Sequence, residues 1–71
     1  MRTFYETLAI AMEQRGMRAV DLARKTGIYQ SYFAKLKNGT FNDATWDKAL
    51  KIIAALDMTP DEFRALQMSE Q

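Results

Sequence analysis

Glycine divides this chain into segments that each carry the hydrophobic periodicity of an α-helix. The three glycines fall at positions 16, 27 and 39, and each follows a run in which apolar residues recur three or four positions apart. Glycine is the residue best able to adopt the left-handed conformation in which helices end. No run alternates with period two for long enough to form a strand. The sequence therefore predicts an all-α fold of five helices, at about residues 3–15, 19–26, 30–37, 45–56 and 60–67.

Capping residues support the starts of two of these helices. Thr3 and Glu6 have the three-residue spacing of a capping box, which satisfies the first backbone N–H groups of a helix. Either Asp43 or Thr45 can cap the fourth helix. The segment GTFNDAT, residues 39–45, is then a connecting loop between the third and fourth helices.

The composition suits one small domain, residues 1–71, and excludes several classes of function. With 48% hydrophobic residues, the chain can bury a single core. It contains no cysteine and no histidine, so it lacks thiolate metal ligands and the commonest general base. We therefore expect no enzyme activity, metal, cofactor or small-molecule ligand. Glu6 and Glu13 interrupt the first apolar run, which excludes a signal peptide or membrane span there and favours a cytoplasmic protein.

Charge is distributed unevenly along the chain, although the net charge is only +1. Residues 1–42 contain seven Lys and Arg against three Asp and Glu, whereas residues 43–71 contain three against six. Between Arg15 and Lys37, Asp21 is the only acidic residue among six basic ones. A basic region of this kind suits a nucleic-acid backbone, but a chance distribution of solvated surface charges explains it equally well.

Apolar residues at helical spacing define the expected hydrophobic core. In the fourth segment, Trp46 is expected to face inward together with Ala49, Leu50 and Ile53, because a single Trp in a regular helical stripe is usually a packing residue. The other expected core positions are Phe4, Leu8, Ala11, Met12, Val20, Leu22, Ala23, Phe63 and Leu66.

The helix expected at residues 30–37 has two opposed faces when successive residues are placed about 100° apart. Phe33 and Leu36 lie on one face, so their burial turns the opposite face outward. That outward face carries Gln30, Ser31, Ala34 and Lys35. Glutamine can pair with adenine, lysine with guanine and serine with either, while an alanine methyl can contact a thymine methyl. The same residue types also make an ordinary exposed helix face, and by themselves they do not identify a function.

Residues 19–39, AVDLARKTGIYQSYFAKLKNG, resemble the helix-turn-helix of the lambda-repressor and Cro-like family. The family pattern has a small residue within the first helix, glycine at the turn, an aliphatic residue after it, and an apolar pair in the recognition helix. These places hold Ala23, Gly27, Ile28, and Phe33 with Leu36. The resemblance extends over about residues 4–66 and implies a five-helix, lambda-repressor-like DNA-binding domain with its helix-turn-helix in helices 2 and 3.

The resemblance also implies roles for particular residues. The base-reading positions of the family fall on Gln30, Ser31 and Lys35, with Ala34 between them. Phosphate-contacting roles are expected for Arg18, Tyr29, Tyr32, Lys37, Asn38 and Thr40.

The chain departs from the family pattern at several places. Ala19 stands where many relatives have a glutamine that supports the first recognition residue. Met12 and Lys37 stand where others have an arginine and a glutamate that form an ion pair. Tyr29 and Tyr32 are larger than the usual residues, and each is either a phosphate contact or a surface aromatic.

We therefore expect a sequence-specific regulator of transcription that binds double-stranded DNA, of the small phage- or plasmid-type repressor class. One recognition helix makes few base contacts, so a homodimer on a two-fold symmetric operator is expected. Candidate residues for the dimer contact are Met58, Phe63, Leu66 and Met68. The alternative is a protein-interaction module, such as an antitoxin that binds a toxin or a phage protein that binds a host regulator.

Overall fold

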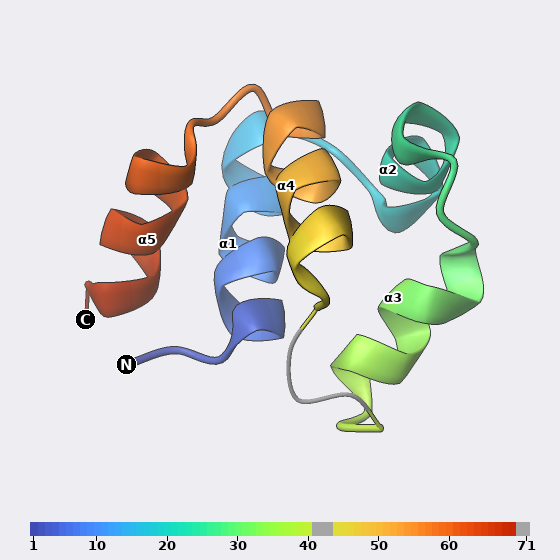
Figure 1. Cartoon of the computed structure of the whole chain (residues 1–71), viewed down its shortest axis with the longest axis horizontal. Coiled ribbons are helices and arrows are strands. Elements are labelled where there is room, and N and C mark those ends of the chain that lie inside the picture. Colours follow the sequence, from blue (N-terminus) through green and yellow to red (C-terminus); the bar gives the residue numbers. More distant parts are fainter. Residues whose placement is uncertain (41–43, 70–71) are drawn as a thin grey trace.

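The computed structural model describes residues 1–40 and 44–69, which form five α-helices and, within those ranges, no strand. The helices are α1 (Phe4–Arg15), α2 (Ala19–Thr26), α3 (Gln30–Lys37), α4 (Trp46–Ala55) and α5 (Pro60–Met68). The all-α, five-helix fold class expected from the sequence is confirmed. Helix α5 packs on α1 and α4, α2 packs on α3 and α4, and α1 contacts α3 (Figure 1). In the described parts of the chain, every helix is too short or too polar to cross a membrane.

Threonines precede three of the helices and act as N-cap residues. At α1, the Thr3 hydroxyl accepts the Glu6 backbone N–H at 3.1 Å, and the Glu6 carboxylate accepts the Thr3 N–H at 2.8 Å. Helix α5 begins with the same reciprocal capping box at Thr59. Thr45 occupies the N-cap position of α4, where its side chain makes no capping hydrogen bond to the described residues. The other expected cap, Asp43, lies outside the described residues.

The core forms where the apolar sides of the helices meet. The rings of Phe4 in α1 and Phe63 in α5 pack with their centroids 5.2 Å apart, which joins the first and last helices. The buried apolar residues are Phe4, Leu8, Ala11, Met12, Leu22, Ile28, Phe33, Leu36, Ile52, Ile53, Leu56 and Phe63. Four other residues expected in the core are only partly buried: Val20, Ala23, Leu50 and Leu66. Of these, Ala23 and Leu66 pack against the core.

Trp46 lies on the surface, and the prediction that it belongs to the core is wrong. It is the first residue of α4, and 74% of its surface is exposed. Burial decreases along α4 towards this end, from Ile52 and Ile53, which are buried, through the partly buried Ala49 and Leu50. The apolar stripe of α4 therefore extends to Trp46, but the neighbouring helices do not reach far enough to cover this end of it.

Arg2 joins the N-terminal segment to the end of α5. The Arg2 backbone N–H donates to the Gln67 carbonyl at 3.0 Å, and the Gln67 side-chain amide donates to the Arg2 carbonyl at 3.2 Å. The Arg2 guanidinium also donates to the carbonyls of Leu66 and Ser69. The N-terminal segment and α5 lie on the side of the molecule away from α2 and α3 (Figure 1).

Truncation of Leu22 tests the packing of α2. Leu22 is fully buried, so Leu22→Ala should lower the free energy of unfolding by about 2–5 kcal/mol through lost contacts and an unfilled cavity. Arg24→Ala, on the exposed side of the same helix, should change it by less than about 0.5 kcal/mol. Urea unfolding monitored by circular dichroism measures both. Equal stability of the two variants would contradict the packing of α2 described above.

Candidate nucleic-acid interface

A short turn at residues 27–29 joins α2 to α3. Gly27 ends α2 in the left-handed conformation, with φ of 74°, and its N–H donates to the Ala23 carbonyl at 2.9 Å. A side chain at Gly27 would meet no atom within 4 Å, so glycine is required for backbone conformation and not for space. The Thr26 hydroxyl donates to the Leu22 carbonyl at 2.6 Å and accepts the Ile28 N–H at 3.2 Å. Thr26, which the sequence pattern did not single out, thus fixes the turn on both sides.

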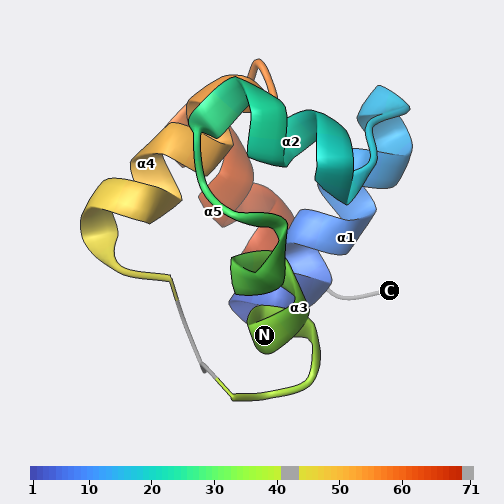
Figure 2. The same cartoon turned by 90° about the vertical axis from the view of Figure 1, so that its right-hand side faces the viewer.

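The motif residues anchor α3 to the core through one of its sides. Phe33 and Leu36 are only 2% and 4% exposed, and Ile28 of the turn is buried beside them. Ala23 of α2 is partly buried against the same core. Figure 2 shows α3 at the front of the molecule, below α2.

The residues predicted to read bases are all exposed on α3: Gln30, Ser31, Ala34 and Lys35. They lie on the side of the helix opposite Phe33 and Leu36. All four side chains are accessible to solvent in the part of the chain that the structure describes. The fold therefore presents a polar helix face at the surface, as a helix that enters a DNA groove requires.

On the flank of α3 towards α2, Gln30 and Lys37 share a shallow hollow of about 200 Å³ with Ala19. The small Ala19 side chain leaves space beside Gln30 at the place where many relatives have a glutamine. Met12, at the other place that departs from the family pattern, is buried in the core, whereas Lys37 is exposed.

Arg18 is the N-cap residue of α2, and its side chain is largely exposed beside Asp21. The Asp21 carboxylate accepts the Arg18 backbone N–H at 2.9 Å and lies 3.7 Å from the Arg18 Nε atom. This backbone hydrogen bond, aided by the positive charges of Arg18 and Arg24, holds the pKa of Asp21 below its usual value. The carboxylate is therefore ionised at neutral pH and keeps the Arg18 side chain at the start of α2.

Three other residues predicted to contact phosphate, Tyr29, Asn38 and Thr40, lie at or beyond the two ends of α3. Tyr29 is the N-cap residue of α3 and is highly exposed. Beyond the other end, the Asn38 Oδ1 atom accepts both the backbone N–H and the hydroxyl of Thr40, at 3.0 and 2.6 Å. This pair of bonds fixes the orientation of the Asn38 side-chain amide.

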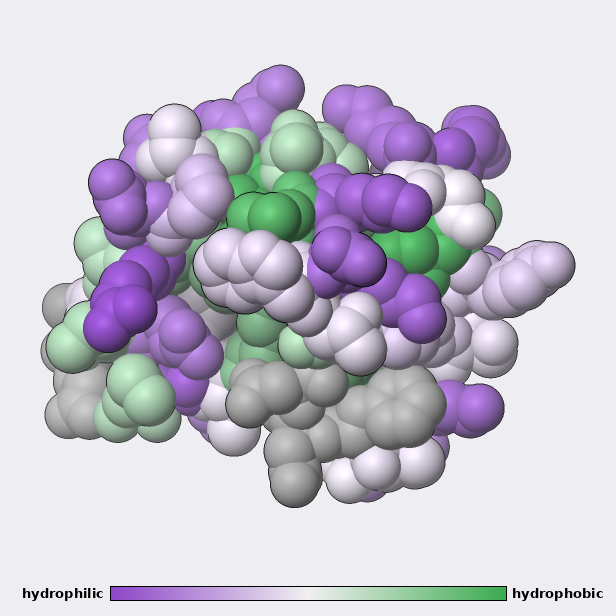
Figure 3. All heavy atoms as spheres, viewed as in Figure 1, coloured by the Kyte–Doolittle hydropathy of each residue, from purple (hydrophilic) through white to green (hydrophobic). Residues whose placement is uncertain are grey.

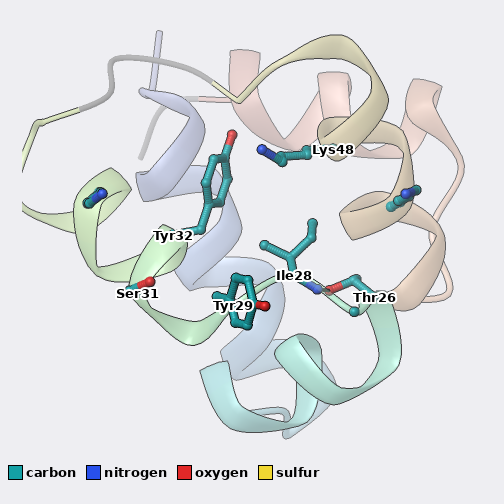
Figure 4. A pocket seen from close by; sticks show the side chains of 9 residues that line it. Thr26, Ile28, Tyr29, Ser31, Tyr32 and Lys48 are labelled. Atoms are coloured by element: carbon teal, nitrogen blue, oxygen red, sulfur yellow. Dashed lines mark hydrogen bonds between the residues drawn. The ribbon is translucent and has the colours of Figure 1, made fainter.

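Tyr32 links α3 to α4, a role that neither alternative drawn from the sequence included. Its hydroxyl oxygen accepts the Thr45 backbone N–H at 3.4 Å, and its ring packs edge-on against Phe33 with centroids 6.1 Å apart. The Lys48 ammonium lies 4.6 Å from the centroid of the Tyr32 ring, within the range of a cation–π contact. Figure 4 shows Tyr32 and Lys48 extending towards each other from the two helices.

A hollow of about 410 Å³ opens on this α4 flank of α3, and we call it the basic hollow. Three lysines line it, Lys35 from α3 and Lys48 and Lys51 from α4, together with Gly27 and Ile28 of the turn and four hydroxyl-bearing side chains (Figure 4). None of the described residues that line it is acidic. The sequence pattern missed Lys48 and Lys51 because they lie outside the motif and only the folded chain brings α4 beside α3.

A family model of the Cro/C1-type helix-turn-helix DNA-binding domain matches residues 7–67. Comparisons with curated proteins and with solved structures gave no match. The matched range includes α2, the turn, α3 and most of the helices that support them. This result confirms the resemblance seen in the sequence and agrees with the five-helix architecture. The chain belongs to the Cro/C1-type helix-turn-helix DNA-binding family.

Proposed function

We propose that the protein is a sequence-specific regulator of transcription that places α3 in the major groove of double-stranded DNA. The observation that carries this proposal is the exposure of Gln30, Ser31 and Lys35 on a helix whose other side is buried. Amide, hydroxyl and ammonium groups are the groups that distinguish base pairs from the major groove. In its finer form, the proposal is a small repressor of phage or plasmid type that acts in the cytoplasm.

Phosphate contacts at both ends of the motif would orient α3 in the groove. Arg18 stands at the start of α2, where unpaired backbone N–H groups also favour an anion. Because the Asn38 Oδ1 atom accepts bonds from Thr40, its Nδ2 group is the part directed to donate to phosphate. Tyr29 and Lys37, exposed at the two ends of α3, would add further contacts to the backbone.

A second copy of the chain would double the number of base contacts. Among the candidates for the dimer contact, Phe63 is buried against Phe4 and is not accessible, whereas Met68 is exposed. Met58 and Leu66 are partly buried and present only part of their surfaces.

The exposed Trp46 borders a hollow between α4 and α5 that is lined largely by apolar side chains. Figure 3, in the same view as Figure 1, shows green apolar patches among the purple polar side chains of this side of the molecule. Asp61 and Arg64, opposite charges three positions apart on α5, also line this hollow. Two copies related by a two-fold axis could pair these charges reciprocally and cover the apolar surface between them. We therefore propose this α4–α5 face, together with Met68, as the dimer contact.

Two substitutions separate base recognition from backbone binding. If each protomer neutralises about four to six phosphates, log K should fall with log salt concentration with a slope of about −3.6 to −5.4 per protomer. Arg18→Ala should weaken binding to all sequences alike, whereas Gln30→Ala should cost about 1–3 kcal/mol and relax the preference at one base pair. Gln14→Ala, at an exposed glutamine of α1, is the matched control.

Fluorescence anisotropy with selected and random duplexes across salt concentrations measures both effects. A Gln30→Ala variant that keeps every base preference of the wild type would contradict the role proposed for α3.

In vitro selection from random duplexes tests the dimer and the operator together. The selected sites should contain two half-sites related by a two-fold axis, with centres about 10–10.5 base pairs apart, because two recognition helices then meet successive major grooves. Selection of a single unpaired half-site would exclude the proposed dimer on DNA. A protein that selects no sequence but co-purifies with a toxin or host regulator would favour the alternative, a protein-interaction module.

A further inference from the structure

We propose that the basic hollow between α3 and α4 binds a backbone phosphate of DNA through Lys48 and Lys51. This inference rests on the proposed function and extends it to two residues outside the helix-turn-helix. It assigns the phosphate to the DNA strand opposite the one that Arg18 contacts at the start of α2.

The position of the basic hollow on α3 supports this assignment. Gln30 lines the hollow on the α2 flank, whereas Tyr32 lines the basic hollow on the α4 flank. The major groove is about 12 Å wide and an α-helix with its side chains about 10–12 Å across, so both flanks of an inserted helix face a sugar–phosphate backbone. The two flanks of α3 would therefore face different DNA strands. Lys48 and Lys51 lie on the α4 flank, whereas Arg18 stands at the start of α2, on the other flank.

The chemistry of the lining is that of an anion site. Ammonium and hydroxyl groups both donate to phosphate oxygens, and Lys48 and Lys51 supply the ammonium groups from α4. The described lining holds no carboxylate that would repel an anion or neutralise these lysines. An anion that enters the basic hollow would therefore meet no acidic side chain among its described lining residues.

Lys48 lies in the first turn of α4, where the neighbouring Asp47 and a bound anion would both make a positive charge more favourable. It is the third residue of α4, where the positive end of the helix dipole disfavours a positive charge. Its ammonium is held over the Tyr32 ring, and the Tyr32 hydroxyl accepts the Thr45 N–H at the start of the same helix. These contacts position the Lys48 side chain at the basic hollow before any ligand binds (Figure 4).

The basic hollow lies beside the exposed face of α3, and this position indicates whether its phosphate belongs to DNA or to a free anion. Ser31 and Lys35 line it and also belong to the exposed face of α3 proposed to read bases. A phosphate bound in the basic hollow would therefore lie directly beside the side of α3 that is proposed to face the groove. This arrangement suits a phosphate of the bound duplex better than a separate small anion.

The first test compares salt dependence between variants of equal charge. Lys48→Gln/Lys51→Gln should make the slope of log K against log salt less steep by about 1.8 per protomer, with base preference unchanged, because two cations no longer displace counterions. Arg15→Gln/Lys25→Gln removes the same charge at the ends of α1 and α2 and should leave the slope nearly unchanged. Lys48→Arg/Lys51→Arg should restore the wild-type slope. Equal slopes for the two glutamine variants would overturn the inference.

The second test identifies the strand. Duplexes in which single phosphates are replaced by neutral methylphosphonates should lose affinity for the wild type at positions on both strands. For Lys48→Gln/Lys51→Gln, sensitivity should disappear on one strand only, and for Arg18→Ala on the other. Loss on the same strand for both variants would overturn the assignment.

Inorganic phosphate provides the remaining comparison. Competition by millimolar phosphate at constant ionic strength should be weak, and strong competition that depends on Lys48 would instead identify a site for a free anion. A wild-type protein that binds no duplex would disprove the proposed function itself, whereas wild-type binding with equal variant slopes would disprove only this inference.

Discussion

The burial of Phe33 and Leu36 is the interaction on which the rest of this structure depends. Helix α3 has only eight residues, and an isolated helix of that length is unstable in water, so its existence and its orientation come from tertiary packing. Because the two buried side chains lie on one side, the helix cannot pack without directing its polar side outward. The candidate recognition surface is thus a geometric consequence of core formation.

Contacts at both ends and on one flank of α3 keep that surface in place. Gly27 and Thr26 set the turn before the helix, and Tyr32 connects the helix to the start of α4. The second connection brings Lys48 beside α3, so the element that supports the recognition helix also contributes charge to its flank. If α3 enters a DNA groove as proposed, the same contacts that stabilise the core also place charged side chains on the flank of α3 that faces the DNA backbone.

Local signals in the sequence predicted most of the fold, whereas contacts between distant segments could not be predicted. The capping box at Thr3 and the left-handed Gly27 depend on neighbouring residues only, so the sequence reveals them. Helical periodicity gives the direction in which Trp46 faces, but not whether a neighbouring helix reaches far enough to cover it. Lys48 was missed for a related reason, because its place beside α3 depends on how α4 packs.

The most direct test of the central claim is a nuclear Overhauser measurement on the complex with a selected duplex. If the outward side of α3 reads bases, the Gln30 side-chain amide and the Ala34 methyl group should give contacts with major-groove protons. Phe33 and Leu36 should keep their contacts within the core. Contacts with DNA confined to other helices, with none from Gln30 or Ala34, would contradict the account.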